Sequence, residues 1–309
     1  MKGSDLMNGK AYNYAALKAD IERLKTEFKG LETGSIGLSV CKRELFYLRL
    51  GSGKNRILYN GAHHGMEWIT SMLLMKAAED TLCAKRENRA LCGFSVSALF
   101  KNTSLYIVPM LNPDGVELET NGLSDEYTED EKNILIKMNK NSSDFSRWQA
   151  NINGVDLNHN YDALWEKSKA AENEYSVFGP GPTRFSGTAP ESEPESRALA
   201  DFTRKLDFKL TISFHSQGKV IYHGFKDKEP AYSLSIARAF EKLSPYRLDT
   251  AEGIASYAGF KDWFVDKFNR PGFTIEVGLG QNPLPVSDFP EIYAETLPII
   301  LGAMTISLP

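Results

Sequence analysis

Short apolar runs rich in β-branched residues alternate along this sequence with longer segments whose apolar residues recur at helical spacing. The short runs, typical of strands buried in a sheet, cover residues 56–60, 105–110, 210–215 and 273–277. The longer segments, typical of amphipathic helices, cover residues 14–29, 66–85, 192–204, 231–243, 258–268 and 291–304. This alternation predicts an α/β fold, a three-layer sandwich with a largely parallel or mixed sheet between helices.

The N-terminal region is expected to belong to the same domain as the rest. Residues 35–40 and 45–50 predict two strands that suit a hairpin, which follows the first helix. A chain of 309 residues can form one large domain or two modest ones. No segment resembles a linker, so we predict one domain over residues 1–309, with residues 1–50 as part of it.

Two stretches between the predicted elements are expected to be irregular. Residues 112–115 (NPDG) predict a turn after the strand at 105–110. Residues 119–150 are polar and predict an excursion that holds a short helix at 133–138.

Charge and cysteine content restrict the partners and the compartment. The net charge is −4, from 36 Lys and Arg against 40 Asp and Glu, which argues against nucleic acid as the main partner. The three cysteines, Cys41, Cys83 and Cys92, are too few for a disulfide framework and favour a reducing compartment. No signal peptide and no membrane-spanning stretch is visible, so we expect a soluble cytoplasmic protein, although a secreted chain whose signal had been removed would look the same.

Histidine is scarce, and three of the five histidines stand beside acidic or amide residues at the ends of predicted strands. His64 and Glu67 follow the strand at 56–60, where open α/β sheets place their ligands. Imidazole nitrogen and carboxylate oxygen are both zinc ligands. A capping glutamate beside a loop histidine produces the same spacing, so this pair alone predicts little. The neighbouring His63, like His223, is interpreted as structural or as lining a pocket.

A third ligand is predicted at the end of the strand LTISFH. His215 would complete a set of two histidines and one glutamate, which leaves a position open for water and is typical of catalytic zinc. The alternative is a loop histidine with ordinary hydrogen bonds. Glu276 stands in the apolar run FTIEV, where a charge is costly without a partner. It is interpreted either as a general base with a raised pKa or as a salt-bridged glutamate.

Three other polar residues could complete such a site. Asp156, in the segment GVDLNHNY, could accept the second ring N–H of a ligand histidine. Asn158 could donate to a carboxylate or carbonyl of a substrate. Arg147 could polarise a scissile carbonyl and hold the resulting oxyanion.

In this order, these motifs resemble those of the zinc metallocarboxypeptidases of the carboxypeptidase A-like family. H-x-x-E, N-P-D-G, G-V-D-L-N-x-N, a late strand-end histidine and T-x-E together cover residues 61–278. The resemblance implies a mixed, mainly eight-stranded sheet between helices and one Zn²⁺ per chain. It implies His64, Glu67 and His215 as zinc ligands, with Glu276 as general base and acid.

The resemblance also implies roles for the flanking residues. Arg147 matches the oxyanion stabiliser, Asp156 the partner of the first zinc histidine, and Asn158 a residue that binds the terminal carboxylate. His159 departs from the pattern, because digestive members carry there an arginine that clamps the C-terminal carboxylate. Tyr257 is the candidate for the family's substrate-side tyrosine, although its register differs.

One subgroup fits these departures best, the γ-D-glutamyl-meso-diaminopimelate peptidases. Residues 258–264, 270–274 and 280–285 resemble it, and several of its members carry N-H in place of the arginine clamp. The resemblance implies hydrolysis of the γ-D-glutamyl–diamino acid bond (meso-diaminopimelate or Lys) of peptidoglycan peptides, by a zinc-bound water with a glutamate base. Alternatives are a general metallocarboxypeptidase that removes C-terminal amino acids, and a non-catalytic binding protein of the same fold. No partner protein, nucleic acid or membrane is implied.

Overall fold

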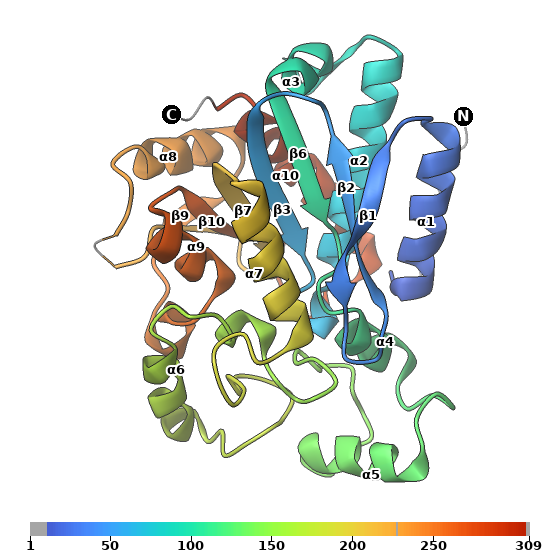
Figure 1. Cartoon of the computed structure of the whole chain (residues 1–309), viewed down its shortest axis with the longest axis vertical. Coiled ribbons are helices and arrows are strands. Elements are labelled where there is room, and N and C mark those ends of the chain that lie inside the picture. The colour runs from blue at the N-terminus through green and yellow to red at the C-terminus, as the bar shows by residue number, and fades with distance from the viewer. Residues whose placement is uncertain (1–10, 227, 307–309) are drawn as a thin grey trace.

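A single eight-stranded sheet organises the molecule (Figure 1). The computed structural model describes residues 11–226 and 228–306. In spatial order the strands are β1 (Glu32–Leu38), β2 (Glu44–Leu50), β6 (Thr103–Val108), β3 (Asn55–Gly61), β7 (Leu210–His215), β10 (Gly272–Glu276), β8 (Val220–His223) and β9 (Arg247–Asp249). β6, β3, β7 and β10 run parallel, whereas β2 and β8 pair antiparallel with them on either side. The predicted fold class, an α/β sandwich with a mixed eight-stranded sheet, is confirmed.

Helices cover both faces of this sheet, and α7 lies in front of it in Figure 1. The helices are α1 (Tyr14–Glu27), α2 (Ile69–Arg86), α3 (Val96–Asn102), α4 (Pro113–Asn121), α5 (Glu129–Met138), α6 (Trp165–Ala171), α7 (Pro194–Leu206), α8 (Ser233–Leu243), α9 (Phe260–Phe268) and α10 (Phe289–Ala303). A two-stranded ribbon, β4 (Ala90–Leu91) and β5 (Phe94–Ser95), precedes α3.

The alternation of side chains along β3 explains why the sheet needs helices on both faces. Ile57 and Tyr59 pack into the core beneath α1, α2, α8 and α10, whereas Leu58 packs into the core beneath α7 and α9. All three side chains are buried. Strands buried on both faces are typical of parallel sheets covered by helices.

The parallel strands bring three loop regions to one edge of the sheet. β7 pairs with both β3 and β10, and Glu276 stands directly opposite His215 in the register. His64 follows the end of β3 by three residues, since that strand ends at Gly61. The carboxyl ends of β3, β7 and β10 therefore converge, which is where open α/β sheets bind ligands.

The segment predicted as a turn at residues 112–115 instead begins a helix, so that prediction is wrong. Asn112 is the N-cap of α4, and its side chain accepts a hydrogen bond of 2.9 Å from the backbone N–H of Gly115. Pro113 occupies the first helical position, where its missing N–H costs nothing. Asn-Pro thus opened a helix because the same residues suit a turn and a helix start.

The predicted excursion at 119–150 is more ordered than expected. Its helix, α5, covers Glu129–Met138 rather than 133–138, and a capping box of Thr128 and Glu131 starts it. A small separate core around the buried Trp148 and Leu135 holds this segment together. The N-terminal hairpin was predicted correctly, because β1 and β2 pair antiparallel.

Near the N-terminus, α1 packs against α2, and β1 and β2 extend the sheet. The predicted domain limits, residues 1 and 309, lie outside the described residues, as do the first ten residues used to predict the compartment. Among the described residues, no helix is long and apolar enough to span a membrane. Cys41, Cys83 and Cys92 are free thiols.

Candidate metal centre and active site

The two imidazoles and the carboxylate predicted from sequence lie against one another. Glu67 belongs to a short 3₁₀ helix, Gly65–Glu67, that follows β3, and His215 is the last residue of the neighbouring β7. The Glu67 carboxylate lies between the two rings: its Oε1 is 2.8 Å from His64 Nδ1, and its Oε2 is 2.9 Å from His215 Nδ1. One donor atom from each of the three residues lies within 4.8 Å of the others.

This donor set fits a catalytic zinc ion. Glu67 and His215 are buried and His64 is nearly so, and each imidazole turns the same ring atom, Nδ1, toward the carboxylate. Two imidazole nitrogens and one carboxylate oxygen are a usual three-residue set for catalytic zinc, with a further position left for water or substrate. Burial acts to raise the pKa of Glu67, but His64 and His215 outweigh it and hold that pKa at about 2.

Asp156 lies behind His64 on the side opposite Glu67. Its Oδ1 is 3.0 Å from His64 Nε2, and its Oδ2 accepts a hydrogen bond of 2.9 Å from the backbone N–H of Arg184. Despite its burial, the pKa of Asp156 lies well below its usual range, because His64, His159 and the Arg184 N–H favour the carboxylate. With a metal ion on the Nδ1 side of His64, this carboxylate would hold the ring proton on Nε2.

His63 packs directly against the candidate metal centre. The ring stacks on His215, with centroids 5.3 Å apart and planes at 26°, and its Nε2 is 3.2 Å from the hydroxyl of Tyr161. Both histidines are buried. Burial, together with the nearby His215 and His64, lowers the pKa of His63. The sequence interpretation of His63 as structural or pocket-lining is consistent with this position.

A cavity of about 540 Å³ opens onto the same residues. Glu276 and Arg147 line it together with His64 and Glu67. Glu276 is half-buried at the end of β10, and burial, together with the negative charge of Glu67, raises its pKa to about 8. The arrangement places a weakly acidic carboxyl group and a guanidinium beside three potential metal ligands, which can support proton transfer and stabilisation of an oxyanion.

The three predicted substrate-binding residues lie outside this group. The described residues that line the cavity do not include Asn158, His159 or Tyr257. The Asn158 side-chain oxygen accepts a hydrogen bond of 3.1 Å from Phe260 N–H, and His159 is buried with Nδ1 3.3 Å from the Ser168 hydroxyl. The ring of Tyr257 lies instead beside two lysines, Lys226 at 4.5 Å and Lys167 at 5.9 Å.

Sequence reasoning missed several polar residues of the cavity. Tyr222, on the short strand β8, lines it near Glu276, whose charge adds to the effect of burial in raising the pKa of Tyr222. Gln281 lies against Arg147, and with its amide oxygen turned inward it accepts hydrogen bonds from both terminal guanidinium nitrogens. Asn282 and Ser216 hydrogen-bond reciprocally at 2.5 and 2.8 Å. The sequence alone could not identify Tyr222, because its position near Glu276 depends on the pairing of β8 with β10.

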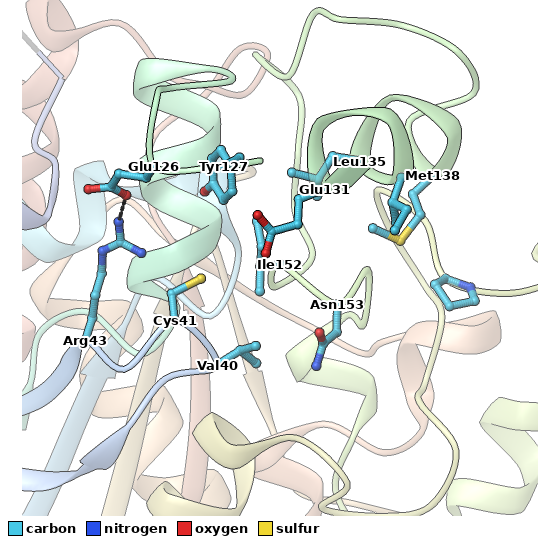
Figure 2. Close-up of a pocket in the computed structure, with 12 residues that line it drawn as sticks. Val40, Cys41, Arg43, Glu126, Tyr127, Glu131, Leu135, Met138, Ile152 and Asn153 are labelled. Atoms are coloured by element: carbon cyan, nitrogen blue, oxygen red, sulfur yellow. Dashed lines mark hydrogen bonds and ion pairs between the residues drawn. The ribbon is translucent and has the colours of Figure 1, made fainter. Parts of the chain in front are cut away.

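A larger cavity, of about 700 Å³, lies elsewhere, between the β1–β2 turn and α5 (Figure 2). Arg43 forms an ion pair with Glu126 on one side of it, and Leu135 and Met138 line the side formed by α5. Within the described residues, His64, Glu67 and His215 form the single group of three possible metal donors, so this cavity lacks one. Its size therefore does not make it the candidate site for hydrolysis.

Comparison with known proteins agrees with this geometry. The family model described as zinc carboxypeptidase matches residues 17–299. A protein of Lysinibacillus sphaericus named γ-D-glutamyl-L-diamino acid endopeptidase 1 is 42% identical over 97% of this chain and 74% of its own length.

Two solved structures share the fold. A crystal structure of thrombin activatable fibrinolysis inhibitor superposes with a TM-score of 0.74 at 19% identity, over 98% of this chain and 82% of the other. A murein-tripeptide amidase from Escherichia coli O157 superposes with a TM-score of 0.53 at 22% identity, over 87% of this chain and 91% of the other.

Proposed function

Because this chain belongs to the zinc carboxypeptidase family and is a metallopeptidase, we propose that it hydrolyses the bond between γ-D-glutamate and a diamino acid in peptidoglycan peptides. The resemblance predicted from sequence is thereby confirmed at the level of the family. The name of the Lysinibacillus relative supports the choice of bond, and the name of the murein-tripeptide amidase supports a cell-wall peptide as substrate. The diamino acid is proposed to be meso-diaminopimelate or lysine.

One observation carries the proposal: His64, Glu67 and His215 converge at the wall of a cavity that Glu276 also lines. When bound there, zinc would supply a Lewis acid that polarises the scissile carbonyl and lowers the pKa of an attacking water toward about 7. A non-catalytic relative would be expected to lack one of these four side chains, and all four are present.

Three residues of the chain would perform the proton transfer, stabilise the oxyanion and orient a metal ligand. Glu276 accepts a proton from the attacking water as the new C–O bond forms, and it returns a proton to the leaving amine as the C–N bond breaks. Arg147 donates N–H groups to the carbonyl oxygen as that oxygen becomes negative. Asp156 keeps the ring of His64 in the orientation and tautomer that leave Nδ1 available.

Replacement of Asp156 by asparagine is expected to weaken zinc binding by about 10–100-fold, the usual cost of removing a partner of a ligand histidine. An amide can present its NH₂ group to His64 Nε2, which removes the preference for a proton there. Competition with a chelating dye would measure the affinity. Unchanged affinity would contradict the positioning role of Asp156.

The substrate proposal is tested against its rival, a general metallocarboxypeptidase. Zinc-loaded protein would be incubated with a γ-D-glutamyl-diaminopimelate tripeptide, with its lysine analogue and with N-acyl dipeptides that end in a free carboxylate. We expect cleavage of the first two and little cleavage of the N-acyl dipeptides, because His159 stands in place of the arginine that would hold a C-terminal carboxylate. Hydrolysis of the N-acyl dipeptides alone would favour the rival.

A further inference from the structure

The two ligand histidines differ in how their second ring nitrogen is held. His64 has Asp156 behind it, at 3.0 Å from Nε2. His215 turns Nδ1 toward Glu67, and its Nε2 is buried without a hydrogen-bond partner among the described residues. Because metal-binding histidines almost always donate their second N–H to an acceptor, His215 requires one.

A second buried nitrogen in the adjacent ring is also unpartnered. Nδ1 of His63 has no hydrogen-bond partner among the residues that the structure describes, and the ring of His63 stacks on that of His215 at 5.3 Å between centroids. Both residues are at most 1% exposed, so bulk solvent does not reach either nitrogen. Buried polar groups are nearly always satisfied, which makes two adjacent exceptions informative.

One choice of tautomers would allow the ring nitrogens of both His63 and His215 to form hydrogen bonds. With Nδ1 of His215 facing Glu67 as a ligand atom, the His215 proton resides on Nε2. If His63 carries its own proton on Nε2, it donates to the hydroxyl oxygen of Tyr161 at 3.2 Å, and its Nδ1 lone pair is free to accept. In the reverse tautomer of His63, a water that bridged the two rings would accept from two N–H groups and would find no acceptor there for its own protons.

We propose that His63 is a positioning residue for His215: its ring stacks on that of His215, and its Nδ1 accepts, through one bridging water, the hydrogen bond that His215 Nε2–H donates. In this arrangement the Tyr161 hydroxyl oxygen accepts from His63 Nε2–H. His63 would thus do for His215 what Asp156 does for His64. A single buried water can bridge two polar groups that have no other hydrogen-bond partner. The inference rests on the proposed metal centre and on no particular substrate.

The zinc affinity of substituted proteins tests this proposed relay, the series of hydrogen bonds from Tyr161 through His63 to His215. His63→Phe keeps an aromatic ring on His215 but removes the acceptor, and we expect it to weaken zinc binding by about 10–100-fold. Tyr161→Phe removes the hydroxyl that faces His63 Nε2 and should weaken binding less. In the His63→Phe background, Tyr161→Phe should not weaken zinc binding further, because both substitutions interrupt the same series of hydrogen bonds. Tyr246→Phe is the matched control, since it removes a buried hydroxyl that contacts Thr296 instead.

A spectroscopic readout separates positioning from general stability. Long-range ¹H–¹⁵N correlation spectra of the histidine rings report which nitrogen carries the proton. In the zinc-loaded wild type we expect the proton on Nε2 of both His63 and His215, and in Tyr161→Phe a mixture of tautomers at His63. Circular dichroism checks that each variant is folded.

The outcomes distinguish this inference from the proposed function. Full zinc affinity in His63→Phe, additive effects of the two substitutions, or a proton on Nδ1 of His63 in the wild type would each overturn the relay. If His63→Phe fails to fold, the wild-type spectrum and Tyr161→Phe still decide. A wild type with the expected tautomers that cleaves no γ-D-glutamyl peptide would refute the proposed substrate and leave the relay standing.

Discussion

Replacing Glu276 by glutamine is expected to lower kcat by about 10²–10⁴-fold while zinc remains bound, because general acid–base catalysis contributes about that factor. The carboxyl group stands at the end of β10, opposite His215 in the register and at the wall of the cavity. Glutamine keeps the size and polarity of the side chain but cannot accept and return a proton. KM should change little, since the lost interaction belongs to the transition state.

The measurement pairs steady-state kinetics on the γ-D-glutamyl peptide with metal analysis of the same sample. Glu166→Gln, on the exposed face of α6, is a matched control that should retain wild-type kcat. The raised pKa of Glu276, about 8, shows that its surroundings favour the protonated form. A divalent cation at the neighbouring residues would favour the carboxylate and lower that pKa. Normal turnover in Glu276→Gln would contradict the proposed role of Glu276 as general base and acid.

Replacing His215 by alanine is expected to weaken zinc binding by more than the roughly 10–100-fold cost of losing an outer partner, because it removes a ligand atom itself. Glu67 would also lose one of the two imidazoles that hold its pKa at about 2. Activity at limiting zinc should fall with the affinity. Chelator competition measures the affinity, and thermal unfolding with and without zinc shows whether the metal still stabilises the folded chain.

His223→Ala is the matched control for this substitution. His223 ends β8, which neighbours β10 in the sheet, and its Nδ1 is 2.5 Å from a carboxylate oxygen of Glu229 rather than near the candidate metal centre. The His223→Ala substitution removes a strand-end imidazole without removing a proposed zinc ligand. Equal zinc affinity in the two variants would contradict the assignment of His215.

The central strands were predictable because their sequences are short, apolar and β-branched. The run LTISFH, for example, became β7 with the predicted limits. The short strands β8 and β9 were not predicted, since they have only four and three residues and their pairing depends on neighbours. α4 was missed because Asn112 and Pro113 suit both a turn and a helix start.

The candidate site was likewise predictable only in part. Strand-end histidines and a buried-strand glutamate can be recognised from local pattern, and the structure brings His64, Glu67 and His215 together at one sheet edge. Tyr257, chosen by its place in the chain, lies beside two lysines, and the tyrosine that lines the cavity is Tyr222. The contact of His63 with His215 joins the loop after β3 to the end of β7, so nothing near either residue in the sequence indicates it.

By itself, the sequence determined the α/β class, the central strands and the identity of the side chains at their carboxyl ends. Those depend on local hydrophobic pattern, which is written in neighbouring residues. The tertiary structure alone decided the strand order β3-β7-β10, and with it which side chains share the cavity. Strand order depends on how distant segments pack, and a hydrogen bond or a stacked ring between them has no signature in either segment alone.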